Sequence, residues 1–103
     1  MTKELEIFME YKIKLEHVEE YEQVMSEITT SLERLGAKDV RWFEALDQPG
    51  LYVEMFKLPN QELYEKIKQL RQSHSNPTFK KIIPYVVGGE NKVHCWAFLR
   101  KEF

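Results

Sequence analysis

Residues 5–15 read LEIFMEYKIKL, and the alternation within this stretch decides the first element of the fold. Every odd position from Leu5 to Leu15 is apolar, whereas Glu6, Glu10 and most of the other even positions are charged. Successive side chains of a strand point to opposite faces of a sheet. The period of two therefore predicts a strand whose odd positions face the core.

The spacing of apolar residues changes after this strand. Apolar side chains now recur every three or four positions, which places them on one side of a helix. They are Val18, Tyr21, Met25, Ile28, Leu32 and Leu35. Glutamates gather at the start of the segment and Arg34 lies near its end, as the helix dipole favours. We expect a helix over residues 17–35, ended by Gly36.

The middle of the chain predicts a β-hairpin. Residues 40–46 and 51–58 are rich in residues that favour strands, and Pro49-Gly50 between them suits the centre of a type II turn. A second helix should follow, with Asn60 as its N-cap. Its apolar stripe is expected to contain Leu63, Ile67, Leu70 and His74.

Asn76-Pro77 interrupts the second helix, because a residue before proline avoids the helical conformation. A short helix over residues 77–83 and a last strand over residues 92–101 complete the chain. The order strand, helix, strand, strand, helix, strand is that of an α+β ferredoxin-like βαββαβ sandwich, a four-stranded antiparallel sheet with two helices on one face. We expect residues 1–103 to form this single domain.

The sheet face that the helices cannot reach is predicted to be rich in aromatic residues. On the hairpin, Phe43, Ala45, Val53 and Met55 form the cleaner apolar set and are expected to face the helices, as is Cys95 on the last strand. The opposite face would then hold Phe8, Glu10, Lys12, Trp42, Glu44, Tyr52, Glu54, Phe56, His94, Trp96, Phe98 and Arg100. So large an apolar patch is typical of an interface. We therefore expect a homodimer whose sheets pack face to face.

Composition narrows the classes of function. The chain has 15 Lys and Arg against 17 Asp and Glu, so no excess positive charge predicts a nucleic-acid partner. The lone Cys95 excludes an intramolecular disulfide and a zinc site of several cysteines. No apolar run approaches the about 20 residues that span a bilayer, and the first residues do not resemble a signal peptide. We expect a cytoplasmic protein without membrane contact.

The chain resembles the dimeric α+β barrel proteins, and among them the antibiotic-biosynthesis-monooxygenase-like group. The first strand with its acidic helix start, LYVEMF at 51–56 leading into NQEL at 60–63, and HSNPTF at 74–79 carry the resemblance. It implies a barrel formed across a dimer and, in active members, a small-molecule cavity between sheet and helices. Members include cofactor-independent monooxygenases, haem-degrading enzymes, isomerases and proteins of unknown role, so the fold does not choose the function.

His74 is the candidate general base or haem ligand, because it continues the stripe of the second helix beside a break where a cavity could open. The alternative is a half-exposed residue at the helix C-terminus. The resemblance disfavours haem degradation, whose members carry an Asn on the first strand and a Trp on the second helix. Here the tryptophans lie on strands, and the matched haem-ligand position falls near Ile82.

Two carboxylates and four tyrosines are the other candidates. Glu44 and Glu54 would share a hairpin face, where they could perform acid–base work or bind a divalent ion, or else pair with Lys12 or Arg100 across the dimer. Tyrosine hydroxyls could bind a phenol or quinone, or the rings could simply fill the core. These are Tyr11, Tyr21, Tyr64 and Tyr85.

Other features favour a structural role. Cys95 is expected to be a small buried hydrophobe rather than a nucleophile. The basic residues of the second half are expected to form solvated surface. They are Lys66, Lys68, Arg71, Lys80 and Lys81.

Three functions remain open. The first is binding of a small hydrophobic or aromatic molecule, with cofactor-free oxygenation by His74, Tyr64 and Tyr21. In that chemistry the protein desolvates the substrate and removes its proton, so that the substrate itself reduces oxygen. The second is a non-catalytic dimer of the same fold that stores a ligand or binds a partner. The third is haem binding; no cofactor or metal is otherwise expected.

Overall fold

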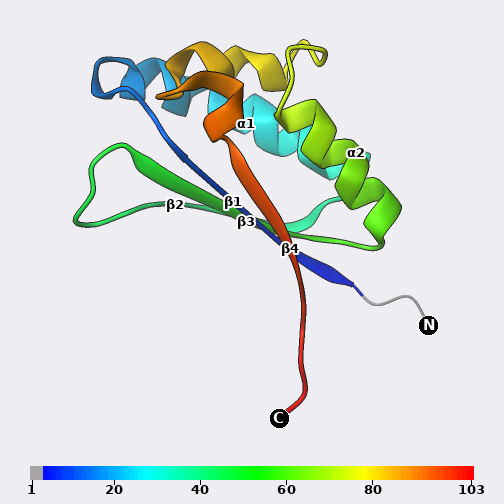
Figure 1. Ribbon diagram of the computed structural model, residues 1–103. Helices are drawn as coiled ribbons and strands as arrows, with labels where there is room; N and C mark the ends of the chain where they lie inside the picture. Colours follow the sequence, from blue (N-terminus) through cyan, green and yellow to red (C-terminus); the bar gives the residue numbers. More distant parts are fainter. Residues whose placement is uncertain (1–3) are drawn as a thin grey trace.

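The fold follows the predicted order of elements. A computed structural model describes residues 4–103 (Figure 1). The strands are β1 (Leu5–Lys12), β2 (Lys38–Glu44), β3 (Leu51–Leu58) and β4 (His94–Leu99), and the α-helices are α1 (Val18–Leu35) and α2 (Gln61–Arg71). Short 3₁₀ helices are η1 (Leu15–His17), η2 (Phe79–Tyr85) and η3 (Gly89–Lys92).

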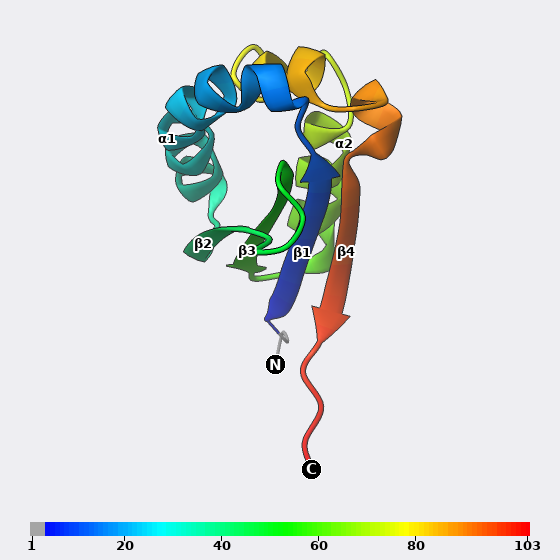
Figure 2. The same ribbon diagram turned by 90° about the vertical axis from the view of Figure 1, so that its left-hand side faces the viewer.

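The four strands form one antiparallel sheet in the order β2-β3-β1-β4. Both α-helices lie on the same side of it, and the turned view shows them arching over the sheet (Figures 1 and 2). The α+β ferredoxin-like sandwich is therefore confirmed. Among residues 4–103, no helix combines the length and the apolar character needed to cross a membrane.

The predicted alternation of β1 and the predicted helical stripe of α1 are both confirmed. The odd positions of β1 and the predicted stripe of α1 meet in the core. The buried members of these two elements are Leu5, Ile7, Met9, Tyr11, Tyr21, Met25, Ile28 and Leu32. Gly36 ends α1 in the left-handed conformation, with φ of 116°. Gly50 has the positive φ, 86°, that a type II turn requires at its third position.

The predicted orientation of the hairpin is wrong. Residues paired across two strands share a face, and β3 pairs Met9 with Glu54 and Tyr11 with Tyr52. The even positions of β3 therefore face the helices, and the pairing of β2 with β3 carries Trp42 to the same side. The residues moved from the predicted outer face to the helix side are Trp42, Glu44, Tyr52, Glu54 and Phe56.

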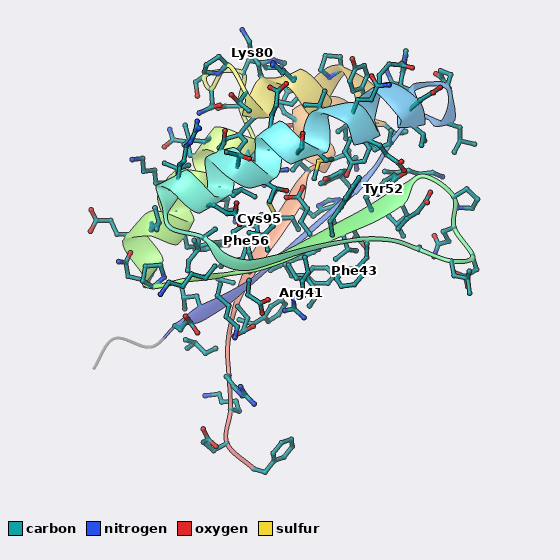
Figure 3. All side chains as sticks on the ribbon, turned by 180° about the vertical axis from the view of Figure 1, so that it is seen from behind. Arg41, Phe43, Tyr52, Phe56, Lys80 and Cys95 are labelled. Atoms are coloured by element: carbon teal, nitrogen blue, oxygen red, sulfur yellow. The ribbon has the colours of Figure 1, made fainter. Side chains whose placement is uncertain are left out.

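The physical reason is that β3 carries apolar residues on both faces. Val53 and Met55 belong to the cleaner apolar set, whereas Glu54 interrupts the set that is buried, and a carboxylate is costly to bury unless it is paired. Figure 3 shows the outcome: Tyr52 and Phe56 point toward the helices, whereas Phe43 points to the other side of the sheet.

The sheet face turned away from the helices is the outer face. Its predicted members on β1 and β4 are placed there, since Phe8 pairs with Trp96 and Glu10 with His94. The set that the strand pairing places there is Glu6, Phe8, Glu10, Lys12, Lys38, Arg41, Phe43, Leu51, Val53, Met55, Lys57, His94, Trp96 and Phe98. Arg100 follows β4 and lines a surface pocket with Arg41 and Phe98. Apolar side chains thus remain exposed on this face, although fewer of them are aromatic than predicted.

The second helix is shorter than predicted. Asn60 is its N-cap, accepting a hydrogen bond of 2.8 Å from the Leu63 N–H, but α2 ends at Arg71 and does not reach His74. The polar residues that follow bind backbone outside the helix. The Gln72 side chain donates to the Val93 carbonyl, and the Asn76 side chain accepts from the Phe79 N–H. The short helix predicted over residues 77–83 is the 3₁₀ helix η2, which begins two residues later. The last strand, β4, is shorter than the predicted 92–101.

Candidate functional site

A buried ion pair lies between the sheet and the helices. Glu54 on β3 and Arg71 on α2 are 0% and 1% exposed. The two terminal nitrogens of Arg71 donate to the two carboxylate oxygens of Glu54 at 2.8 and 2.6 Å. This bidentate geometry satisfies the carboxylate at a place where water does not reach it. The cost of burying two charges is offset only by such close pairing.

Three aromatic side chains extend the ion pair toward the surface. The Tyr11 hydroxyl donates to Glu54, and the hydroxyls of Tyr11 and Tyr21 are 2.6 Å apart. The Trp42 Nε1–H donates to the Tyr21 hydroxyl at 2.8 Å. Because the proton of Tyr11 is directed at the carboxylate, Tyr21 must be the donor to Tyr11. Trp42, Tyr21, Tyr11, Glu54 and Arg71 are the polar chain.

The electrostatics of the polar chain keep its tyrosines protonated. Burial, followed by the Glu54 charge, raises the pKa of both Tyr11 and Tyr21 well above the usual value for tyrosine. Burial opposes the charge on Arg71, yet the adjacent Glu54 outweighs it and raises the pKa of the guanidinium. The polar chain is therefore neutral at its tyrosines and charged only at the Glu54–Arg71 pair.

The outer end of the polar chain opens into a pocket of about 210 Å³ between α1 and the β2–β3 hairpin. This hairpin pocket is lined by Glu22, Trp42, Phe43, Glu44 and Tyr52. The rings of Trp42 and Tyr52 stack with centroids 5.9 Å apart and planes inclined by 21°. The ring of Tyr21 lies 4.5 Å from that of Tyr52. The pocket thus has an aromatic wall held in place by the polar chain.

The polar groups at the hairpin pocket are acceptors. The Tyr52 hydroxyl donates to Glu22 at 2.5 Å, and burial followed by this contact raises the pKa of Tyr52. Glu44 accepts from the Gly50 N–H at 3.3 Å. The Trp42 N–H is already used within the polar chain. A molecule bound in the pocket therefore finds two carboxylates, Glu22 and Glu44, that can accept further hydrogen bonds next to the aromatic rings.

His74 lies away from this pocket. Its side chain is 60% exposed, and its Nε2 is 3.2 Å from Glu90. A backbone hydrogen bond and then this contact with His74 lower the pKa of Glu90. The predicted place of His74, on the buried stripe beside a cavity, is wrong because α2 ends before it.

The predicted tyrosines separate into different environments. Tyr11 and Tyr21 belong to the polar chain. Tyr64 is partly buried under β4, where its hydroxyl donates to the Cys95 carbonyl at 3.4 Å. Tyr85 contacts the ring of His17, with centroids 5.2 Å apart. The structure therefore places the buried Tyr21 behind the hairpin pocket, in contact with the rings of Trp42 and Tyr52, and leaves Tyr64 and His74 elsewhere.

Glu44 and Glu54 share a face, as predicted, but they do not form a pair. Trp42 is the partner of Glu54 across the strands, and Tyr52 is the partner of Glu44. Glu54 binds Arg71, which also removes the predicted alternative of an ion pair from Glu54 across the dimer. Glu44 lies at the rim of the hairpin pocket.

Cys95 is buried as expected, and burial raises the pKa of its thiol to about 11. Such a thiol is a weak nucleophile at neutral pH. Within residues 4–103, no group of three or more His, Cys, Asp or Glu side chains is arranged to hold a metal ion.

Arg71 is the main residue that sequence reasoning missed, since it was expected on the solvated surface. One signal was present: Arg71 lies four positions after the buried Ile67, on the same side of α2. An arginine on a helix stripe together with a glutamate inside an apolar strand indicates a buried pair. Each residue alone indicates solvent exposure.

Comparisons with known proteins identify the fold. No family model and no curated protein matches the sequence. Solved structures do match: an antibiotic biosynthesis monooxygenase has 13% identity and a TM-score of 0.65, covering 96% of this chain and 98% of its own. A conserved Methanosarcina mazei protein has 16% identity and a TM-score of 0.68, covering 97% and 95%.

A dimeric ferredoxin-like protein from an uncultured marine organism also matches, with 16% identity and a TM-score of 0.63 over 100% of this chain and 92% of its own. At such identities the likeness shows the fold alone. The predicted resemblance in fold to the antibiotic-biosynthesis-monooxygenase-like group is confirmed, and the activity of this chain has to be argued from its own residues.

Proposed function

We propose that this chain binds a small aromatic molecule carrying hydrogen-bond donors, such as a phenol, in the hairpin pocket. The observation that supports this most directly is the combination of the stacked Trp42 and Tyr52 rings with the carboxylates of Glu22 and Glu44. Aromatic walls with a few placed polar groups are typical of small-molecule sites. Since the nearby donors are spent on internal hydrogen bonds, the ligand supplies the donor.

The proposed chemistry is cofactor-free oxygenation of the bound phenol. Glu22 or Glu44 takes the phenol proton, and desolvation by the aromatic wall favours electron transfer from the phenolate to O₂. One ring C–H becomes C=O, giving a quinone, while the second oxygen atom leaves as water. The substrate loses four electrons and O₂ gains four. The name of one structural neighbour, an antibiotic biosynthesis monooxygenase, supports this class of reaction.

In this proposal the roles first expected of His74, Tyr64 and Tyr21 are redistributed. Tyr21 lies behind the aromatic wall and holds Trp42 through its hydroxyl. The exposed His74 and the distant Tyr64 take no part. The non-catalytic alternative uses the same pocket to hold a ligand without turnover, and haem binding has no supporting contact in the hairpin pocket.

We also propose that the protein is a homodimer whose outer faces meet. Phe43, Trp96 and Phe98 are 48%, 42% and 52% exposed on that face, and burying such rings is favourable in water. A structural neighbour named as a dimeric ferredoxin-like protein supports dimerisation. Light scattering at micromolar concentration should give the mass of two chains, and Phe98→Glu should give one. Leu46→Glu, at an exposed position of the hairpin loop, is the control and should leave the dimer intact.

Calorimetric titration with 1-naphthol tests the binding site. We expect 1-naphthol to bind and 1-methoxynaphthalene, which lacks the donor, to bind several-fold more weakly. Glu22→Gln should weaken 1-naphthol about tenfold, since a hydrogen bond to a charged group contributes about 1.5 kcal/mol or more. Glu19→Gln, at an exposed position of the same helix, is the control. Equal binding of both compounds, or equal effects of both variants, would contradict the proposal.

Oxygen uptake distinguishes the enzyme from the ligand-binding alternative. Wild type should consume one O₂ per 1-naphthol oxidised without releasing hydrogen peroxide, and Glu22→Gln should lower the rate. If 1-naphthol binds but no oxygen is consumed, the oxygenase proposal is overturned and the non-catalytic function stands.

A further inference from the structure

The hairpin pocket carries two carboxylates that no cation of the described chain balances. Neither Glu22 nor Glu44 forms an ion pair with any of residues 4–103. Both lie on the helix side of the sheet, since Glu22 belongs to α1 and Glu44 pairs with Tyr52. Only Phe43 of the pocket lining belongs to the outer face, so dimerisation through that face does not cover the two carboxylates.

The Tyr52 hydroxyl brings these carboxylates together. It donates to Glu22 Oε2 at 2.5 Å. Burial, then the contact with Glu22, and then the charge of Glu44 and its contact with the hydroxyl all raise the pKa of Tyr52. A hydroxyl has one proton, so it can serve only one carboxylate at a time. Two negative groups therefore share one end of the Tyr52 ring, where their repulsion is uncompensated.

The segments around the pocket add negative charge and no positive charge. Residues 15–33 contain six glutamates and no lysine or arginine. Residues 42–56 contain three acidic residues and likewise no lysine or arginine. Among residues 4–103, the ion pairs that reach these segments from outside are Lys81–Glu27 and Arg71–Glu54, and neither pair lines the pocket. The field of these segments therefore attracts cations to the pocket.

The aromatic wall of the pocket favours the same sign of charge. Trp42 is 38% exposed although it stacks on Tyr52 and contacts Tyr21, so part of its ring is left for a ligand. Among aromatic side chains, tryptophan attracts a cation to its ring face most strongly. The ring faces and the carboxylates thus select together for a positively charged ligand.

We infer that the phenol bound in the hairpin pocket carries an alkylammonium group next to its hydroxyl. The inference rests on the proposed function for the pocket and the phenol, and it adds the charge of the ligand. The ammonium lies between Glu22 and Glu44, where it gains charge-assisted hydrogen bonds, and the ring lies against Trp42. Because both carboxylates are at one end of Tyr52, the two donor groups of the ligand have to be neighbours.

Calorimetric titration with 2-(aminomethyl)phenol tests the charge of the ligand. We expect it to bind about fivefold more tightly than 2-ethylphenol, which has the hydroxyl but no ammonium, as for partly exposed charge pairs. Salt should weaken the binding of 2-(aminomethyl)phenol and leave that of 2-ethylphenol unchanged. The isomer 4-(aminomethyl)phenol, whose donors lie at opposite ends of the ring, should bind more weakly than the 2-isomer.

A matched pair of variants tests the place of the ammonium. Glu44→Gln should remove most of the advantage of 2-(aminomethyl)phenol over 2-ethylphenol. Asp47→Asn removes the same charge from the hairpin loop outside the pocket lining and should leave that advantage intact. On titration of the wild-type protein, the indole N–H of Trp42 should shift in nitrogen–proton correlation spectra.

Three results would each overturn the inference. They are equal affinities for 2-(aminomethyl)phenol and 2-ethylphenol, equal affinities for the 2- and 4-isomers, and equal losses in Glu44→Gln and Asp47→Asn. The proposed function survives all three if 1-naphthol still binds, since 1-naphthol has no ammonium group. If neither 1-naphthol nor any of these phenols binds, the proposed function fails together with the inference.

Discussion

The guanidinium of Arg71 on α2 holds the carboxylate of Glu54 on β3 through two hydrogen bonds in the middle of the core. Neither residue has another charged partner among residues 4–103. The pair joins the second helix to the central part of the sheet. It also supplies the fixed charge to which Tyr11, and through it Tyr21 and Trp42, are directed.

Arg71→Met should lower the free energy of unfolding by about 3–5 kcal/mol, because it leaves the Glu54 carboxylate buried without a partner. Urea unfolding followed by circular dichroism measures this. Arg71→Lys keeps the charge and loses the two-point contact, so its loss should be smaller. Replacing both residues, Glu54→Leu with Arg71→Met, should recover much of the stability. Lys66→Met is the surface control, and an equal loss there would refute the role of the pair.

Tyr11→Phe should destabilise the protein by about 1–3 kcal/mol, since it leaves buried hydrogen-bonding groups of Glu54 and Tyr21 unsatisfied. The same unfolding measurement applies. Tyr85→Phe removes a hydroxyl outside the polar chain and should cost much less. If the two variants unfold alike, the hydrogen bonds of Tyr11 contribute nothing beyond ring packing.

Tyr21→Phe removes the acceptor of the Trp42 N–H while keeping the aromatic wall. We expect a change in tryptophan emission and weaker binding of 1-naphthol, because the Trp42 ring loses the contact that orients it. Fluorescence and calorimetry report the two effects. Unchanged emission together with unchanged binding would show that packing alone positions Trp42.

Stability should fall as the pH rises above about 10. In the unfolded chain tyrosine titrates near its ordinary pKa of 10.0, whereas burial raises the pKa of Tyr11 and Tyr21 in the folded state. Above pH 10 the unfolded state therefore binds fewer protons than the folded state, and stability declines by up to about 1.4 kcal/mol per pH unit for each such group. Tyr21→Phe should flatten this decline in urea unfolding between pH 9 and 11, and Tyr85→Phe is the control.

Gly50→Ala, in the β2–β3 hairpin, should lower the free energy of unfolding more than Gly89→Ala, in the loop before β4. Both glycines have positive φ, 86° and 73°. A Cβ on Gly50 would also lie 2.7 Å from the Ile13 carbonyl oxygen, whereas one on Gly89 meets nothing within 4 Å. We expect about 1 kcal/mol for the conformation alone at Gly89 and about 2–3 kcal/mol at Gly50. Equal losses would show that the close approach to the Ile13 carbonyl is relieved at little cost.

The local elements were predictable wherever one period dominates. β1 has an apolar residue at every odd position and α1 has a continuous stripe, so each buries the face that its sequence indicates. The hairpin and α2 were harder, because β3 has large apolar residues on both faces and α2 has few apolar residues. Which face of these elements is buried depends on the residues of the element that packs against them. The sequence of one segment alone does not carry that information.

The candidate site was correspondingly less predictable than the fold. Aromatic residues and carboxylates on the hairpin were recognised, but they were assigned to the outer face and to a dimer contact. His74 was predicted as the reactive group because it continues the apolar stripe of the second helix beside a break where a cavity could open. In the structure that histidine is exposed. The pocket is instead held by hydrogen bonds between residues far apart in the chain, Trp42 with Tyr21 across 21 positions and Tyr52 with Glu22 across 30.

The sequence by itself determined the order of the elements, the inward faces of β1 and α1, and the presence of more apolar side chains than two helices cover. Those features follow from the local spacing of apolar residues and from the fact that two helices cover only one face of the sheet. Only the tertiary structure decided that Glu54 lies inside and that Trp42 and Tyr52 line a pocket. The reason is that burying a carboxylate is favourable only with its partner, and Arg71 reaches Glu54 only after α2 packs on the sheet.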